Sequence, residues 1–148
     1  LVYGDALVSG NARVYGDARV YGNAWVQFGS VVVDFKANLQ AAIACSLNLY
    51  PVHGVYTLFK RVNKVKDGIY QSYYDSSFTY EDGKESVAQD ADPNPDIDYR
   101  QGIHVSTPFY YTNGDTLIKV SVKLEEVICC LAGELRCRKV TTIGEIKP

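Results

Sequence analysis

The chain has 148 residues, a formal net charge of -2, and 47% hydrophobic and 22% charged residues. This composition is too apolar for a disordered chain, and the length suits one domain or two small ones. The balance of charges argues against nucleic acid as the main partner. The sequence lacks a run of about 18 apolar residues that would indicate a membrane span, and its start does not resemble a signal peptide.

The four cysteines are badly spaced for the disulfide framework of a secreted protein, because Cys129 and Cys130 are adjacent. We expect these two, together with Cys45 and Cys137, to be reduced thiols in a cytosolic protein. Zinc is not expected, since the cysteines lack a paired spacing and nearby histidines. The first residue is Leu1 rather than methionine, and it is in phase with the repeats that follow, so further repeats upstream are expected.

Five six-residue repeats fill residues 2–31. Each begins with valine, and the first four carry glycine followed by Asp or Asn at their third and fourth positions. Gly-Asp and Gly-Asn favour turns, and a β-branched residue between such turns favours a very short strand. The pattern resembles the hexapeptide-repeat family, which implies a short left-handed β-helix over residues 1–33 in which three repeats form one coil.

That resemblance implies that residues eighteen apart stack, so that Tyr3 would lie over Tyr21 and Leu7 over Trp25. The resulting aromatic and apolar stripe is a candidate interface. So short a β-helix cannot bury its own core, and trimers are common in the family, so a homo-oligomer, preferably a trimer, is expected. Many members are acyltransferases with a catalytic histidine at the coil edge, but these repeats contain no histidine.

Residues 34–52 form a transition to a β-rich domain over residues 53–148. Leu39, Ala42, Ile43 and Leu47 keep a helical spacing, and Pro51 would end that helix. Beyond it the pattern predicts six strands, at 55–62, 69–74, 78–80, 102–106, 116–124 and 135–143. Turns are predicted at residues 66–68 and, as a hairpin, at Asn113-Gly114. The expected fold is mainly β: the β-helix, then a small β or α+β domain.

Short segments at 58–62, 102–106 and 135–140 also resemble a domain of unknown function from bacteriophage and prophage proteins. This resemblance implies a phage context without implying a reaction. Such domains follow repeat segments in phage proteins, which agrees with the pairing in this chain.

The segment around Arg100, His104 and Ser106 is the densest in chemically active residues. A serine nucleophile would also need a carboxylate to orient its histidine, and no second motif clearly supplies one. The same groups could instead hold a nucleotide by phosphate contacts and stacking, or be structural. The remaining candidate ligand-binding residues are Tyr73, Tyr74, Arg136 and Arg138. An ADP-ribosyltransferase-like site is an alternative that would use Lys60, Arg61, His104 and Glu145.

An acidic segment runs from Asp90 to Asp98 with oxygen-bearing side chains at alternate positions. A helix-loop-helix calcium site needs glycine at its sixth position and glutamate at its twelfth, where this chain has Pro95 and Gln101. A solvated acidic loop is therefore preferred to a weak ion site. Twelve tyrosines are present, which indicates either a recognition surface or a tyrosine-rich core edge. The seven around the acidic segment are Tyr70, Tyr73, Tyr74, Tyr80, Tyr99, Tyr110 and Tyr111.

Together these features favour a non-enzymatic, phage-encoded binding protein in the cytoplasm of an infected host. Its partner would be a nucleotide-like signal, sequestered to counter host defence, or a host or phage protein. An enzyme acting on NAD or a nucleotide and a structural virion-associated protein remain alternatives. No cofactor, metal or membrane is expected.

Overall fold

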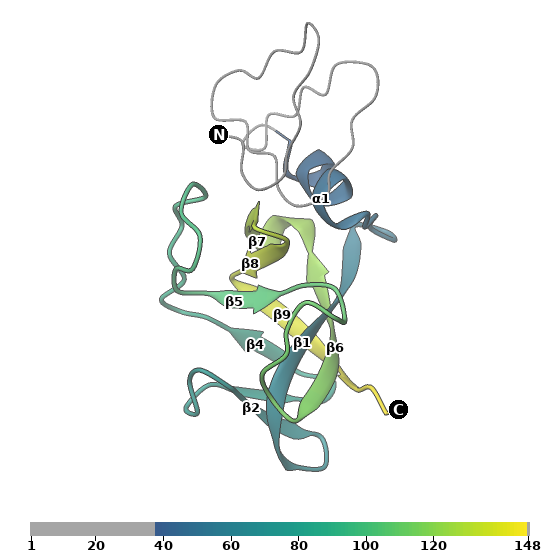
Figure 1. The fold of residues 1–148 in the computed structure, drawn as a ribbon, viewed down its shortest axis with the longest axis vertical. Helices are drawn as coiled ribbons and strands as arrows, with labels where there is room; N and C mark the ends of the chain where they lie inside the picture. The colour runs from purple at the N-terminus through teal and green to yellow at the C-terminus, as the bar shows by residue number, and fades with distance from the viewer. Residues whose placement is uncertain (1–37, 148) are drawn as a thin grey trace, which may run out of the picture. The chain divides into compact units, whose positions relative to one another are not determined.

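A computed structural model describes residues 38–147, and in this range the protein is mainly β, with a nearly closed, barrel-like sheet (Figure 1). The predicted β-helix and its candidate interface residues lie outside the described range.

The predicted helix is present as α1 (Leu39–Leu47), which packs against the strand β7 (Val127–Leu131). The side chain of Asn38 caps its first turn by accepting a hydrogen bond from the Ala41 N–H at 2.9 Å. Asn48 ends the helix in the left-handed conformation, with φ of 53°, so the helix stops before Pro51. None of the helices in residues 38–147 is long and apolar enough to cross a membrane.

The larger sheet has six strands in the order β3-β2-β1-β6-β9-β4, and every hydrogen-bonded pair is antiparallel. Its two end strands, β3 and β4, contact one another, and the Ser86 hydroxyl donates to the carbonyl of Thr79 at 3.0 Å. The sheet therefore almost closes on itself, which protects both edges. Its strands are β1 (Val55–Lys66), β2 (Ile69–Ser72), β3 (Thr79–Glu81), β4 (Glu85–Val87), β6 (Thr116–Lys123) and β9 (Lys139–Glu145).

A smaller antiparallel sheet has the order β5-β8-β7, where β5 is Ile103–Val105 and β8 is Glu134–Cys137. A 3-10 turn, η1 (Leu124–Glu126), leads from β6 into β7. β5 runs across the direction of β1 (Figure 1), and Phe59 and Ser106 join the two strands by two backbone hydrogen bonds of 2.8 and 3.0 Å. This junction brings the smaller sheet against the barrel.

The core follows from the alternation of side chains along the strands. On β1, Tyr56, Leu58 and Val62 are fully buried, and on β6 the buried Val122 and Val120 pair with Tyr56 and Leu58. Burial of each such aliphatic side chain contributes about 1.5–3 kcal/mol. Lys60 occupies the inward position between Leu58 and Val62 and is only 8% exposed. A lysine in an apolar row needs compensating partners, and they define the candidate site.

The structure differs from the sequence-based predictions in three respects. The strand predicted at 135–143 is interrupted at Arg138 and forms β8 and β9 in different sheets, while β4 and β7 were not predicted. The hairpin at Asn113-Gly114 is wrong, because residues 107–115 form a loop and β6 pairs instead with β1 and β9. Gly114 packs so tightly against β1 that a Cβ atom there would lie 2.8 Å from the Val62 carbonyl oxygen. Its φ of 106° serves this close approach rather than a hairpin turn.

Candidate functional site

A buried carboxylate lies at the centre of the candidate site. Glu134 opens β8, its side chain is 4% exposed, and it accepts hydrogen bonds from two groups. One is Nδ1 of His104 on β5, at 2.8 Å, and the other is the hydroxyl of Tyr111 in the loop after β5. Burial by itself raises the pKa of Glu134, but these hydrogen bonds and the nearby cations outweigh it and hold the pKa below its usual range.

His104 uses both of its ring nitrogens. Nδ1 faces Glu134, and Nε2 lies 2.8 Å from the carbonyl oxygen of Arg100. A carbonyl oxygen can only accept a hydrogen bond, and so can an ionised carboxylate, so both nitrogens must carry protons. Burial lowers the pKa of His104, but the bonds to Glu134 and to Arg100 more than offset this and raise it above 6.5. Between the lowered pKa of Glu134 and the raised pKa of His104, the pair is therefore imidazolium and carboxylate.

Lys60 adds a second cation beside this pair. Its Nζ donates to the carbonyl oxygen of His104 at 2.9 Å and lies 5.6 Å from the ring centroid of Tyr111 and 6.0 Å from that of Tyr80. Burial lowers the pKa of Lys60 to about 8, and the negative charge of Glu134 opposes the shift. Lys60, His104, Tyr111 and Glu134 are called the polar cluster below.

The turn between β7 and β8 holds the loop that follows β5. The Ser106 hydroxyl donates to the carbonyl of Gly133 at 2.5 Å, and the Tyr110 hydroxyl donates to the carbonyl of Ala132 at 2.8 Å. Ala132 has a φ of 50°, a conformation that non-glycine residues seldom adopt. The side chains of the loop therefore satisfy the carbonyls of a strained turn, and the turn fixes where the loop lies.

Exposed aromatic side chains surround this loop. Phe109 is 92% exposed, Tyr74 79% and Tyr99 77%. Tyr74 stacks edge-on with Tyr73, and its hydroxyl accepts a hydrogen bond from Asn113 in the loop at 3.2 Å. The pKa of Tyr110 is raised by burial and by the neighbouring Glu134 and Tyr99, which places Tyr99 beside Tyr110. The set called the aromatic loop surface below consists of Tyr73, Tyr74, Tyr99, Phe109 and Tyr110.

The three arginines predicted to bind a ligand lie in different environments. Arg136 is 2% exposed, and its guanidinium donates to the backbone carbonyls of Asn94 and Ile97. Gly102 makes room for it, because a Cβ atom at that position would lie 2.7 Å from Cγ of Arg136. Arg138 is exposed between β8 and β9, and the exposed Arg100 lies 3.8 Å from Asp92. Arg136 therefore anchors the acidic loop, whereas Arg100 and Arg138 reach solvent.

Two catalytic patterns considered from the sequence are not assembled here. Ser106 donates to Gly133, whereas Nε2 of His104 faces Arg100, so the serine and the histidine do not form a nucleophile–base pair. For the ADP-ribosyltransferase pattern, Glu145 pairs with Lys64 at 2.8 Å, away from His104. Arg61 donates to the carbonyl of Gly114 at 3.2 Å.

Sequence analysis missed the carboxylate that orients His104. Glu134 follows a Gly in a segment with no motif around it, and only the pairing of β5 with β8 brings it to the histidine. Lys60 had one usable signal, because it stands at an inward position of an alternating strand. The role of Tyr111 depends on a loop whose path the sequence pattern does not determine.

The acidic segment uses its own side chains to fix its backbone. Asp92 accepts a hydrogen bond from the N–H of Asn94 at 2.9 Å, and the Asn94 side chain accepts one from the N–H of Asp96 at 3.0 Å. Within residues 38–147, no group of three His, Cys, Asp or Glu side chains is placed to hold a metal ion. The four cysteines are free thiols, of which only Cys45 is exposed.

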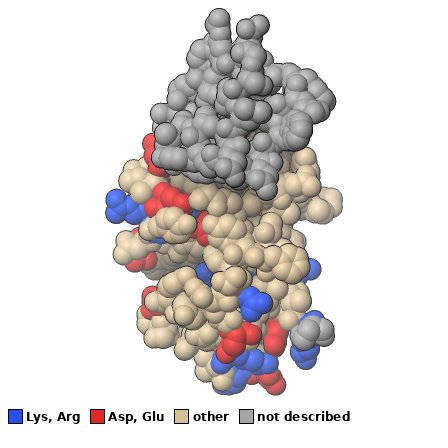
Figure 2. Space-filling view, viewed as in Figure 1, with Lys and Arg blue, Asp and Glu red and all other residues tan. Residues whose placement is uncertain are grey.

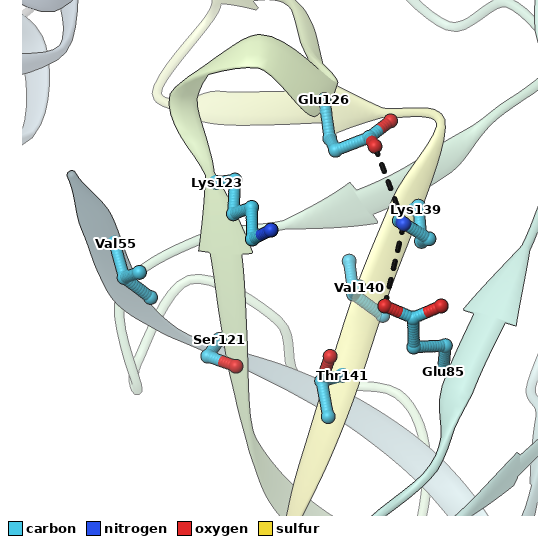
Figure 3. A pocket seen from close by; sticks show the side chains of 8 residues that line it. All are labelled: Val55, Glu85, Ser121, Lys123, Glu126, Lys139, Val140 and Thr141. Carbon is cyan, nitrogen blue, oxygen red and sulfur yellow. Dashed lines mark ion pairs between the residues drawn. The ribbon is translucent and has the colours of Figure 1, made fainter.

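A shallow pocket of about 70 Å³ lies on the outside of the barrel, and no residue of the polar cluster lines it (Figure 3). Lys139 lies between Glu85 and Glu126, at 3.3 and 3.4 Å, so its charge is compensated within the pocket wall. In Figure 2, basic and acidic side chains are interspersed on the face shown of the described residues. The pocket is lined by Val55, Glu85, Ser121, Lys123, Glu126, Lys139, Val140 and Thr141.

Comparison with known proteins finds no matching family model, no matching curated protein and no matching solved structure. The interpretation of the site therefore starts from its own chemistry.

Proposed function

We propose that the chain is a non-enzymatic binding protein of phage or prophage origin that captures a protein partner through the aromatic loop surface. The amino-terminal repeats, as a left-handed β-helix, would assemble it, preferably as a trimer through Tyr3, Tyr21, Leu7 and Trp25. It would act in the cytoplasm of an infected bacterium, where capture of a host protein would counter defence.

The observation that carries this proposal is the exposure of large aromatic side chains on an anchored loop. Phe109 is 92% exposed, yet the loop that carries it is fixed at Tyr110 and Tyr111. Tyrosine and phenylalanine are enriched at protein interfaces, because they bury a large area at low cost in side-chain entropy. A loop already fixed before binding avoids most of the cost of ordering it.

The environment of His104 favours binding over catalysis. A general base needs an unprotonated nitrogen within reach of a substrate. Both nitrogens of His104 donate to groups of the protein, and the hydroxyl of Ser106 is likewise occupied. These groups maintain the shape of the loop surface.

The placement of the arginines favours a protein partner over a nucleotide-like signal. Capture of a phosphate group would use arginines that are free to form paired hydrogen bonds with it. Arg136 is buried against backbone carbonyls, and of the arginines in residues 38–147 only Arg100 and Arg138 are exposed. A nucleotide-like ligand is therefore the second outcome that the experiment must distinguish.

The test is affinity capture by the full chain from lysates of the host, followed by calorimetry with the purified partner. We expect Phe109→Ser and Tyr99→Ser to weaken binding at least tenfold, since loss of a central aromatic at an interface costs about 2 kcal/mol or more. The matched control is Val65→Ser, which removes an apolar side chain that is 54% exposed near the end of β1.

Equal binding by Phe109→Ser, Tyr99→Ser and Val65→Ser would contradict the proposal. Specific binding of a purified nucleotide that is lost in Arg100→Ala and retained in Phe109→Ser would replace the protein partner by a nucleotide.

A further inference from the structure

Two sides of the aromatic loop surface are tied to the same pair of side chains. On one side, Nε2 of His104 holds the carbonyl of Arg100, the residue that follows the exposed Tyr99. On the other side, Glu134 holds the hydroxyl of Tyr111, whose ring packs edge-on against Tyr110 with centroids 4.9 Å apart. The contact between His104 and Glu134 closes this chain of bonds at 2.8 Å.

We propose that the His104–Glu134 pair is a proton-controlled clamp, which holds the two sides of the aromatic loop surface together only while His104 carries both ring protons. This inference deepens the proposed function, on which its biological meaning depends, by giving the binding surface a pH-dependent state.

The clamp follows from a count of protons. A neutral imidazole has one N–H, whereas His104 faces two acceptors, the Arg100 carbonyl and the Glu134 carboxylate. If the remaining proton stays on Nε2, a lone pair on Nδ1 faces the ionised carboxylate and the contact is repulsive. If it stays on Nδ1, the Arg100 carbonyl is released. Either way, loss of one proton breaks one link.

Charged and titratable groups on each neighbouring element determine the pH range in which the clamp is closed. Lys60 on β1 donates to the His104 carbonyl, Tyr111 in the loop donates to Glu134, and Cys137 on β8 influences the pKa of Lys60. Arg136 stands opposite His104 in the β5–β8 pairing and donates to the acidic loop. Burial and the charge of Lys60 both lower the pKa of His104. The hydrogen bonds to Glu134 and Arg100 outweigh these two effects, so the pKa of His104 is raised.

The sign of the pH effect follows from the two shifts. The raised pKa of His104 keeps the clamp closed at pH 6.5 and opens it as pH rises through that pKa. The lowered pKa of Glu134 means that acid opens the clamp only below the usual range of a glutamate. The surface is therefore fixed between the lowered pKa of Glu134 and the raised pKa of His104, and it loosens as pH rises through the latter.

Tyr99 is the side chain expected to respond most. Its φ of 54° is unfavourable for a residue with a side chain, so the surrounding contacts must hold it there. The bond from His104 to the next carbonyl is one such contact. Its loss should let residues 98–100 relax and move the ring of Tyr99 away from Tyr110.

The test is an NMR titration of the full chain, labelled in its histidine and tyrosine rings, from pH 5.5 to 9. The chain has only two histidines, His53 and His104, so His53→Gln assigns the signals and is the matched control. We expect the ring signals of Tyr99 and Tyr111 to shift with the same midpoint as His104, while those of the unclamped Tyr74 stay constant. His53→Gln should leave this behaviour unchanged.

Two variants assign the titration to the clamp. Glu134→Gln should lower the midpoint of His104 and uncouple the tyrosine signals from it. Lys60→Met should raise the midpoint, since Lys60 disfavours the imidazolium. Tyrosine signals that stay constant while His104 titrates would overturn the clamp. Tyrosine signals that no longer titrate in Lys60→Met would also overturn it, because they would be responding to Lys60 rather than to His104. The wild-type titration decides the question even if Glu134→Gln does not fold.

The titration needs no partner, so its failure can be distinguished from that of the proposed function. If the tyrosines titrate with His104 but no partner binds in a manner that depends on Phe109, the clamp stands and the docking role is removed. If a partner binds through Phe109, but binding is independent of pH and the tyrosines do not titrate with His104, the docking role stands and the clamp is removed.

Discussion

The interior of the barrel and the polar cluster beside it are both buried, but different forces stabilise them. In the barrel, Leu58, Val62 and Val120 pack as apolar side chains whose contribution does not depend on pH. In the polar cluster, burial opposes the charges of Lys60 and Glu134, and hydrogen bonds and mutual attraction must offset it. The barrel therefore gives the domain its stability, whereas the polar cluster positions the loops and lowers that stability somewhat.

The largest effect is expected from an opened cavity in the barrel. Leu58→Ala should reduce the free energy of unfolding by about 2–5 kcal/mol. The side chain is fully buried, and a nearly closed sheet cannot collapse to fill the cavity that its removal leaves. Urea denaturation at pH 6 and pH 9 should give the same loss at both values. A loss that varied strongly between them would show that the barrel and the cluster are not separable.

Removal of the central carboxylate charge comes next. Glu134→Gln should cost about 2–3 kcal/mol while His104 is protonated, since it leaves the imidazolium without its counter-ion. The loss should shrink below the lowered pKa of Glu134, where Glu134 becomes protonated, and above the raised pKa of His104, where His104 becomes neutral. Denaturation curves across this range check the prediction, and Glu85→Gln, on an exposed glutamate, is the control. A loss independent of pH would contradict it.

Lys60→Met should change stability in the opposite direction. The folded protein holds the pKa of Lys60 at about 8, below its ordinary 10.5, so the contribution of Lys60 to wild-type stability should become less unfavourable as pH rises above about 8. An apolar side chain of similar length removes the buried charge and should stabilise the protein by about 1–2 kcal/mol at pH 7.

In Lys60→Met this pH-dependent contribution should disappear. Thermal melts at pH 7 and pH 9.5 compare the two proteins, with Lys119→Met, on a partly exposed lysine of β6, as the control. A destabilised Lys60→Met would show that the bond to the His104 carbonyl outweighs the cost of burial.

The smallest effect on stability is expected at the aromatic loop surface. Phe109→Ser should change the free energy of unfolding by less than about 0.5 kcal/mol, because the side chain is 92% exposed. The same variant should abolish most of the partner binding, so stability and binding separate at this residue. A large loss of stability would show that Phe109 contributes to the fold itself.

The sequence predicts the barrel better than the cluster for a physical reason. Side-chain periodicity is a local signal: alternation placed β1 and β6, and a helical spacing placed α1. β7 was missed because four of its five side chains are buried in a row, so it shows no alternation, and β4 has only three residues. The cluster joins residues from β1, β5, β8 and a loop, which meet only through the pairing of strands distant in the sequence. His104 was singled out from its neighbours, but Glu134 had no signal of its own.

The most direct test of the docking surface is native mass spectrometry of the full chain purified gently from host cells. The account predicts complexes with a protein partner at integral stoichiometry, present in the wild type and in Val65→Ser and lost in Phe109→Ser. Identical spectra for the wild type and Phe109→Ser would contradict the central claim that the exposed aromatic loop binds a partner.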